Sequence, residues 1–233
     1  MQDFSGGARR PELSGANAGK AEKGYANMET KPTKAHRSQA DRSAATREKV
    51  IEAARDVLFA QGYSGATMQA IRKAAGMSVG AIQHQFPTKA KIMAALIVQF
   101  SAHRTRVYTD AIRRGTTPRE SMENLIDANF QMLRGPEMAA ALEIHLARRN
   151  DPDLEREVGP STRRFDRRVR LWVYKILRAA GVEDDETHQS LQLLNNAVTG
   201  GLTVEYIRNP DGAPIERAVA IWKAQMLNLI FRG

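Results

Sequence analysis

The chain has 233 residues, a formal net charge of +9 and a pI of about 10.0, and 42% of its residues are hydrophobic. This length is enough for one or two domains with a buried core, and the positive charge favours a polyanionic partner, either nucleic acid or an anionic membrane surface. The absence of cysteine excludes disulfides and thiolate metal sites, and no apolar run approaches the ~18 residues that a membrane-spanning helix needs.

Residues 1–43 are rich in Gly, Ala, Ser, Lys and Arg and contain almost no large apolar side chains. Such a segment cannot bury enough surface to offset its conformational entropy, so we expect a disordered basic arm. Its basic residues, among them Arg37 and Arg42, either contact DNA phosphates and the minor groove or are simply solvated. The N-terminus lacks the apolar segment of a signal peptide, so we expect a soluble cytoplasmic protein.

A first helix is predicted over Thr46–Gln61, because Val50, Ala54, Val57 and Leu58 share one of its faces. Two short helices joined by a tight turn follow between Thr67 and Phe86. Thr67 and Ser78 are typical N-cap residues, and Gly76 is a typical left-handed helix end. Each short helix repeats its apolar residues at i, i+3 and i+7, as Met68, Ile71 and Ala75 and as Val79, Ile82 and Phe86.

The segment Thr67–Phe86 therefore has the pattern of a helix-turn-helix, whose second helix reads bases in the major groove. The outward positions of that second helix are small or neutral and hydrogen-bonding: Gly80, Ala81, Gln83, His84 and Gln85. Small residues allow a helix to approach base edges closely, and Gln can bond adenine at two edge atoms. The alternative interpretation is an ordinary helical corner whose polar face is only solvated.

With its flanks, this pattern resembles the DNA-binding domain of the tetracycline-repressor (TetR-type) family of bacterial transcriptional regulators, over roughly residues 44–104. The matching residues are the runs Thr46–Ala54 and Phe59–Tyr63, together with Thr67, Ile71, Ala74–Gly76, Ser78, Gly80, Ile82, His84, Phe86 and Lys89. Two positions depart from the family pattern. Val79 replaces the usual Lys, Arg or Pro, and Gln83 replaces the usual Tyr, so the operator sequence is less predictable.

The resemblance implies a ligand-responsive regulator, in most cases a repressor, that binds a palindromic operator as a homodimer. An alternative from another class is a non-specific architectural DNA-binding protein without an effector. Thr67, Ser78 and Lys89 are expected to hold phosphates, since Lys89 follows a helix cap at Thr88. The full set of expected DNA contacts is Thr46, Arg47, Thr67, Met68, Ser78, Val79, Gly80, Ala81, Gln83, His84 and Lys89.

The helix that starts at Thr88 should continue to near Gly115, about 37 Å in length, and so belong to both parts of the chain. Residues 105–233 are expected to form a helical ligand-binding and dimerisation domain. Its helices are predicted over Pro118–Leu133, Glu137–Arg149, Asp151–Ala180 (kinked or interrupted at Gly159–Pro160), Asp185–Arg208 and Pro214–Phe231. The fold class is therefore all-α, with about nine helices.

The predicted helix Asp185–Arg208 is apolar on two faces and needs two partners. We therefore expect a homodimer in which the last two helices of each chain meet. Gly200 and Gly201 inside this helix indicate either a close helix–helix approach or a helix break. The residues expected at the dimer interface are Leu191, Leu194, Val198, Trp222 and Met226.

The effector cannot be identified from the sequence, although an apolar pocket suggests an aromatic or lipid-like compound. The candidate pocket residues, each of which is also a plausible plain core residue, are Met93, Ile97, Phe100, Phe130, His145 and Trp172. No phosphate-binding Gly-rich loop, nucleophile elbow or His-Glu-x-x-His pattern is present, and the histidines lack metal-ligand spacing. We therefore expect no enzymatic activity, no catalytic residue, no cofactor and no metal.

Overall fold

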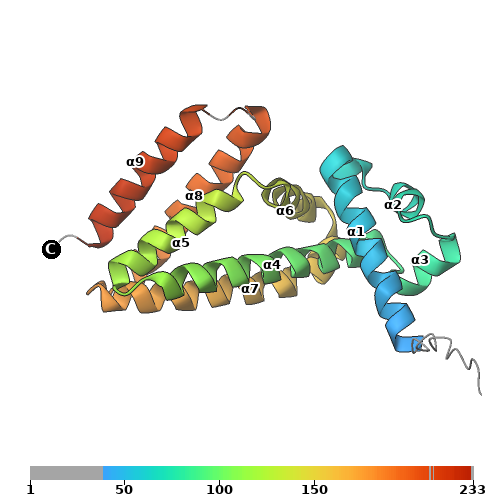
Figure 1. Cartoon of the computed structure of the whole chain (residues 1–233), viewed down its shortest axis with the longest axis horizontal. Helices are drawn as coiled ribbons and strands as arrows, with labels where there is room; N and C mark the ends of the chain where they lie inside the picture. The colour runs from blue at the N-terminus through green and yellow to red at the C-terminus, as the bar shows by residue number, and fades with distance from the viewer. Residues whose placement is uncertain (1–38, 210, 212, 232–233) are drawn as a thin grey trace, which may run out of the picture. The chain divides into compact units, whose positions relative to one another are not determined.

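The computed structural model describes residues 39–209, 211 and 213–231, and the structural statements below concern these residues. The described part of the chain contains nine α-helices and a short 3-10 helix, with no strand (Figure 1). The all-α expectation is confirmed. Residues 1–38 of the predicted arm lie outside the described residues. Its last part, residues 39–43, belongs to the first helix.

Four helices carry the N-terminal half: α1 (Gln39–Gly65), α2 (Met68–Ala75), α3 (Val79–Gln85) and α4 (Lys89–Arg114). The predicted caps are confirmed, since the hydroxyls of Thr67, Ser78 and Thr88 each accept a backbone N–H from the first turn that follows. Gly76 ends α2 in the left-handed conformation, with φ 60° and ψ 40°. Local side-chain chemistry therefore defines the ends of the short helices.

The helix α1 begins seven residues earlier than the predicted start at Thr46. The side-chain amide of Gln85 in α3 donates to the Ser43 hydroxyl at 3.1 Å. This contact between residues far apart in the sequence holds the first turns of α1 against α3. A tertiary contact of this kind is not visible in the local sequence pattern.

The C-terminal half consists of α5 (Pro118–Met132), α6 (Pro136–Ala147), the 3-10 helix η1 (Arg148–Asn150), α7 (Pro152–Ala179), α8 (Asp185–Arg208) and α9 (Ala213–Ile230). Proline in the first turn of α5, α6 and α7 suits positions whose N–H has no intrahelical partner. Of the two alternatives expected for α7 at Gly159–Pro160, the interruption is wrong, because the helix continues through both residues, and the kink remains a prediction.

Two hydrophobic cores organise the fold. The first core joins α1–α4 and also contains Ala140, Ala141 and Ile144 of α6 and Leu154 and Val158 of α7. The second core joins the C-terminal half of α4 with α5, α7, α8 and α9. Residues of α6 and α7 therefore complete the core of the N-terminal helices, and the domain boundary expected at residues 104/105 remains a prediction.

The helix α4 contributes to both cores. It is 26 residues and so about 39 Å long, and it packs along α7 and α5 (Figure 1). Met93 and Phe100 near its start belong to the first core, and Tyr108 and Ala111 near its end belong to the second. A displacement at either end of this helix must therefore disturb packing in the other core.

The end of α1 bends at Gly62, where φ is 68° and ψ is 179°. This backbone region is nearly exclusive to glycine. The next backbone N–H, that of Tyr63, donates to the Glu143 carboxylate of α6 at 2.5 Å. A Cβ atom on Gly62 would lie 2.9 Å from the same carboxylate oxygen. The bend thus brings the backbone of the N-terminal helices into direct contact with α6.

We expect Gly62→Ala to lower the free energy of unfolding by about 1–3 kcal/mol, since it adds backbone strain and a contact with Glu143. Gly76→Ala is the matched control, because Gly76 also has a positive φ but a Cβ atom added there would meet no described atom within 4 Å. Urea denaturation should show the larger loss for Gly62→Ala. Equal losses would mean that the Glu143 contact contributes nothing measurable.

Candidate DNA-reading surface and effector cavity

The helices α2 and α3, which we call the reading head, are fixed to the first core by buried Ile71, Ile82 and Phe86. On the opposite side of α3, the side chains of Val79, Gln83 and His84 are exposed, as is Gly80. These four residues are among the expected DNA contacts. Ala81 and Met68 are half-buried, and Met68 packs against the first core, so they present less surface to a partner.

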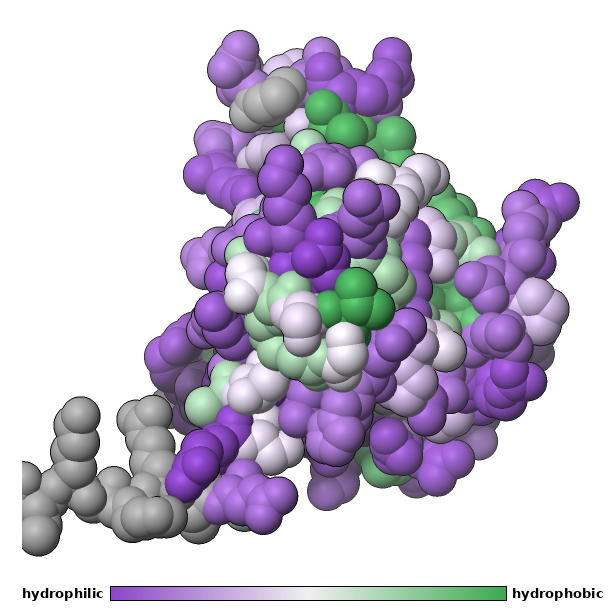
Figure 2. Space-filling view, turned by 90° about the vertical axis from the view of Figure 1, so that its right-hand side faces the viewer, coloured by the Kyte–Doolittle hydropathy of each residue, from purple (hydrophilic) through white to green (hydrophobic). Residues whose placement is uncertain are grey.

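Figure 2 views the side of the molecule that carries α2 and α3, at the right of Figure 1. A pale and green patch of weakly polar and apolar atoms is surrounded there by hydrophilic surface. Val79, which is 55% exposed, is the large apolar side chain that α3 presents to solvent. A small, weakly charged patch of this kind suits close contact with base edges in the major groove.

Arg47 lies beside the reading head, with its guanidinium carbon 4.2 Å from the centre of the Phe86 ring. This stacking leaves an exposed cation next to α3, where DNA phosphates would lie if α3 enters the groove. Thr46 is less available, because its hydroxyl donates to the Arg42 carbonyl at 2.7 Å. The Thr67 and Ser78 hydroxyls likewise already serve as helix caps.

Lys89 is placed differently from the phosphate contact that the sequence suggested. Its ammonium donates to the Tyr63 carbonyl at 2.5 Å and lies 3.7 Å from the centre of the Tyr63 ring. Burial lowers the pKa of Lys89, and the nearby Asp151 carboxylate partly offsets that effect. This ammonium therefore ties the start of α4 to the bend after Gly62, and its expected phosphate contact remains a prediction.

Tyr63 is the centre of a polar joint between the reading head and the C-terminal helices. Its hydroxyl donates to Asp151 at 3.4 Å, and its backbone N–H donates to Glu143. Burial, followed by the charge and the hydrogen bond of Asp151, raises the pKa of Tyr63 to about 12. The phenol therefore stays protonated at neutral pH and remains a hydrogen-bond donor to the carboxylate.

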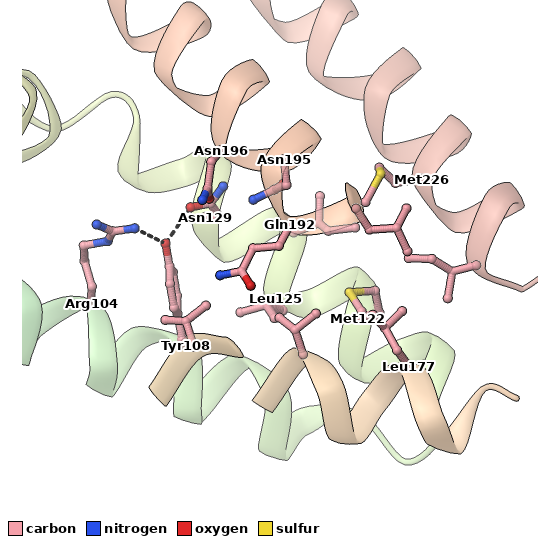
Figure 3. Close-up of a pocket in the computed structure, with 15 residues that line it drawn as sticks. Arg104, Tyr108, Met122, Leu125, Asn129, Leu177, Gln192, Asn195, Asn196 and Met226 are labelled. Carbon is pink, nitrogen blue, oxygen red and sulfur yellow. Dashed lines mark hydrogen bonds between the residues drawn. The ribbon is translucent and has the colours of Figure 1, made fainter. Parts of the chain in front are cut away.

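A cavity of about 70 Å³ lies among α4, α5, α7, α8 and α9. Its apolar wall consists of Met122, Leu125, Ile126, Val169, Val173, Leu177, Leu191, Met226 and Ile230, and its polar wall of Arg104, Tyr108, Asn129, Gln192, Asn195 and Asn196. Figure 3 shows Arg104, Tyr108 and Asn129 at one end and Met122, Leu177 and Met226 at the other, with Gln192 and Leu125 between them. The cavity is therefore suited to an amphipathic molecule.

A chain of hydrogen bonds runs along the polar wall. Arg104 donates to the Tyr108 hydroxyl at 3.1 Å, and that hydroxyl donates to the Asn129 side-chain carbonyl at 2.5 Å (Figure 3). The Asn129 amide then donates to the Thr199 hydroxyl at 3.0 Å. These bonds connect α4 with α5 and α8. A molecule that competes for any of these groups would alter the contacts among all three helices.

None of the pocket residues expected from the sequence lines this cavity. Met93, Ile97 and Phe100 belong to the first core, and Phe130 is buried in the second. Trp172 packs at the edge of the second core. Large apolar residues thus fill the cores, whereas the cavity is marked by polar residues on otherwise apolar faces. Asn129, within the apolar face of α5, is the sequence signal that could have indicated it. The expected effector contacts remain a prediction.

His145 also lies outside the cavity and has a structural role. Its Nδ1 accepts a hydrogen bond from the Arg148 guanidinium at 2.8 Å, which requires a neutral ring because arginine can only donate. Burial, and then the positive charges of Arg148 and Arg104, lower the pKa of His145 to about 4. This histidine therefore disfavours protonation in the folded state.

Because the folded pKa lies below the unfolded value of about 6.5, the neutral His145 contributes fully to stability above that pH. We expect the free energy of unfolding to fall by up to about 3 kcal/mol from this residue as the pH drops from 6.5 to 4. Urea unfolding at several pH values in that range should show that the free energy of unfolding depends less on pH in His145→Gln than in the parent protein. His84→Gln is the control. An equal pH dependence of the free energy of unfolding in His145→Gln and in the parent would contradict the lowered pKa of His145.

Residues 50–96 match the model of the family described as bacterial regulatory proteins, tetR family. The chain is 26% identical over 181 residues to the HTH-type transcriptional regulator CymR of Pseudomonas putida, covering 78% of this chain and 89% of that protein. It is 28% identical to the HTH-type transcriptional repressor AcnR of Corynebacterium efficiens, covering 69% and 81%. The chain belongs to the TetR family of bacterial regulators. It is accordingly a transcriptional regulator.

Solved structures share the fold of this TetR-family regulator. A transcriptional regulator from Rhodococcus sp. Rha1 has a TM-score of 0.66 at 22% identity, covering 80% of this chain and 96% of that one. The transcriptional regulator FadR of Bacillus subtilis, solved in complex with stearoyl-CoA, has a TM-score of 0.62 at 16% identity, covering 79% of this chain and 97% of that one. At these identities the likeness concerns the fold alone.

The last two helices of the TetR-family regulator present apolar side chains to solvent. On α8, Leu193 is 70% and Leu194 48% exposed. Further exposed apolar residues on α8 and α9 are Val204, Ile207, Ile221 and Leu229. No atom of the described residues lies within 4 Å of a Cβ built on Gly200 or Gly201. The helix does not break there, so these glycines leave an open, flat segment of α8.

Two of the residues expected at a dimer interface are buried within their own chain. Leu191 and Met226 are 4% and 5% exposed and line the cavity of their own chain. Their helical positions face the second core, so we correct this part of the expectation. Val198 and Trp222 are half-buried against the second core, and Leu194 remains exposed.

Other kinds of site have little support in the TetR-family regulator. Within the described residues, no helix is both long and apolar enough to cross a membrane. The same residues contain no group of three or more His, Cys, Asp or Glu side chains placed to hold a metal ion. CymR and AcnR, the relatives described above, are named as a transcriptional regulator and a transcriptional repressor rather than as enzymes.

Proposed function

We propose that this TetR-family regulator is a ligand-responsive repressor that binds a near-palindromic operator as a homodimer. The observation that carries the proposal is the placement of α4. Its N-cap, Thr88, follows the reading head almost directly, and Arg104 and Tyr108 near its other end line the cavity. A stiff helix thus connects the surface suited to DNA with the cavity suited to a ligand.

In this proposal Val79, Gly80, Gln83 and His84 face base edges, and Arg47 contacts phosphate. The exposure of these residues on one side of α3 supports the assignment. The short, weakly charged reading surface also supports sequence-specific contacts, because base edges are read by hydrogen bonds and apolar contacts. The names of relatives such as AcnR support repression rather than activation.

The proposed homodimer forms through the exposed apolar surface of α8 and α9. Leu193, Leu194 and Ile221 would leave water on association, which is favourable in proportion to the apolar area buried. The open surface at Gly200 and Gly201 would allow a helix of the second copy to approach closely. A two-fold dimer of this kind requires operator half-sites about 34–36 Å apart if both reading heads enter successive major grooves.

The proposed switch acts through the packing between α4 and its neighbours. A ligand that binds better when α4 has moved shifts the population toward an arrangement in which the two reading heads no longer match the operator. The Tyr63 joint, with Glu143 of α6 and Asp151 at the start of α7, supplies a second connection. FadR, a protein of the same fold, was solved with stearoyl-CoA, which supports a ligand-binding role for this regulator.

The test begins with selection of a preferred duplex from random DNA by the full chain, followed by titration of the selected and a scrambled duplex. Compounds that raise the melting temperature are then added to the operator titration. A coupling of about 1–3 kcal/mol should weaken operator binding about 5- to 150-fold, and operator DNA should weaken ligand binding by the same factor.

Two results would contradict parts of the proposal. Equal affinity for the selected and scrambled duplexes would favour a non-specific architectural DNA-binding protein, for which the net charge of +9 would suffice. Saturating, cavity-bound compounds that leave operator affinity unchanged would contradict the ligand switch and leave ligand-independent repression.

A further inference from the structure

We propose that the effector is a small organic monocarboxylate whose carboxylate pairs with Arg104 and whose apolar body extends toward Met122 and Met226. This inference rests on the proposed ligand switch and concerns the same cavity. It follows from the charge of the polar wall, the arrangement of the two walls and the cavity volume.

Arg104 is the charged side chain among the residues that line the cavity. No carboxylate of the described residues lies within the 4.0 Å that defines an ion pair with it, and Asp166 interacts with its charge only at longer range. The guanidinium instead lies 4.5 Å from the centre of the Phe165 ring and donates to the neutral Tyr108 hydroxyl. Its Nε is buried and has no hydrogen-bond partner in the described part of the chain. A partly desolvated cation without a contacting anion favours a ligand that brings a negative charge.

The polar wall offers further donors beside Arg104. Gln192, Asn195 and Asn196 line the cavity, and their side-chain amides make no hydrogen bond to a described residue. A carboxylate can accept from the guanidinium and from such amides at the same time. Charged groups do not accompany Arg104 on this wall, so the site matches one negative charge rather than the several of a nucleotide or a coenzyme A ester.

The opposite wall determines the rest of the ligand. In Figure 3, Met122, Leu177 and Met226 lie at the end away from Arg104. Methionine and leucine side chains accept apolar groups of varied shape, so both a substituted aromatic ring and a short alkyl chain are suitable bodies. The ligand therefore lies with its carboxylate toward α4 and its apolar end between α5, α7 and α9.

The small volume of the cavity indicates that ligand binding is coupled to a separation of the surrounding helices. A cavity of about 150 Å³ holds benzene, whereas this one measures about 70 Å³. An aromatic or alkyl carboxylate therefore fits only when the surrounding helices separate. The carboxylate also competes for the Arg104–Tyr108 bond, the first in the chain that reaches Asn129 and Thr199. Binding thus favours an arrangement in which α4 has moved relative to α5 and α8.

The experiment uses the full chain and four acids, each paired with its neutral primary amide: benzoate, 4-ethylbenzoate, hexanoate and octanoate. We expect at least one acid to raise the melting temperature and to bind in calorimetry, while its amide binds at least about 10-fold more weakly. This comparison within the unmodified protein does not depend on any variant folding. Absence of binding by all four acids, or equal binding by acids and amides, overturns the proposal.

Variants then locate the carboxylate. Arg104→Met should weaken the binding acid by about 10- to 150-fold, and Arg104→Lys, which keeps the charge but loses the planar fork, should weaken it less. Arg106→Met removes an exposed arginine from the same helix and should leave the affinity unchanged. Operator binding without ligand shows that each variant is folded. Unchanged acid affinity in a folded Arg104→Met variant overturns the assignment of the carboxylate to Arg104.

Failure of this inference is distinguishable from failure of the proposed switch. If acids bind through Arg104 but operator affinity stays the same, the carboxylate site stands and the switch does not. If amides release the operator as well as acids do, the switch stands and the carboxylate inference is overturned.

Discussion

Leu194→Glu should convert the regulator into monomers and weaken operator binding by about 10²- to 10⁴-fold, the gain normally obtained by linking two binding heads. Leu194 is 48% exposed in the single chain, so glutamate there leaves the protomer core intact. In the proposed dimer the same carboxylate would be buried without a partner, which is strongly unfavourable. Sedimentation velocity at micromolar concentration and operator titration measure the two effects.

Leu146→Glu is the matched control for the dimer variant. Leu146 on α6 is 65% exposed and lies outside α8 and α9, so the variant adds the same charge to another apolar surface position. It should sediment and bind the operator like the parent. A Leu194→Glu protein that remains dimeric, or a parent protein that sediments as a monomer, would rule out the proposed interface.

Gln83→Ala should lower the affinity for the selected duplex by about 1–3 kcal/mol, the discrimination that one bidentate base contact supplies. Gln83 is exposed on the outer side of α3, so the substitution removes no packing from the first core. Affinity for a scrambled duplex should change little, because non-specific binding depends on phosphates. The ratio of the two affinities is therefore the informative quantity.

Two comparisons separate base reading from other effects. Gln131→Ala removes an exposed glutamine from α5, away from the reading head, and should preserve both affinities. Arg47→Ala should weaken binding to both duplexes alike. It should also reduce the slope of log affinity against log salt concentration by about one unit, as expected for one phosphate contact. An equal loss on both duplexes for Gln83→Ala would show that Gln83 does not contact a base edge.

The local sequence determined the helices and the helix-turn-helix. Thr67, Ser78 and Thr88 cap their helices through hydrogen bonds that span three residues, and Gly76 ends α2 through its own backbone freedom. The i, i+3, i+7 stripes likewise identified Ile71, Ile82 and Phe86 as core residues. These interactions lie within a turn or two of the chain, so the pattern of residue types was sufficient to predict them.

The tertiary structure decided how the helices share their apolar surface. From the sequence, Met93, Phe100 and Trp172 were candidates for a pocket although plain core was the favoured interpretation, because periodicity identifies a buried face without naming its partner. The fold places Met93 and Phe100 in the core of the N-terminal helices and directs Leu191 and Met226 inward to the cavity. It also brings Ala140 and Leu154 into the core of the N-terminal helices.

The polar sites depended on the same long-range packing. Arg104, Tyr108, Asn129 and Thr199 come from three helices and form one hydrogen-bonded chain only after those helices pack together. Lys89 was assigned to phosphate because it follows a cap, yet the fold places the Tyr63 carbonyl and ring within its reach. Sequence spacing could not reveal these pairings, since each partner is chosen by tertiary proximity and by the cost of leaving a buried polar group unpaired.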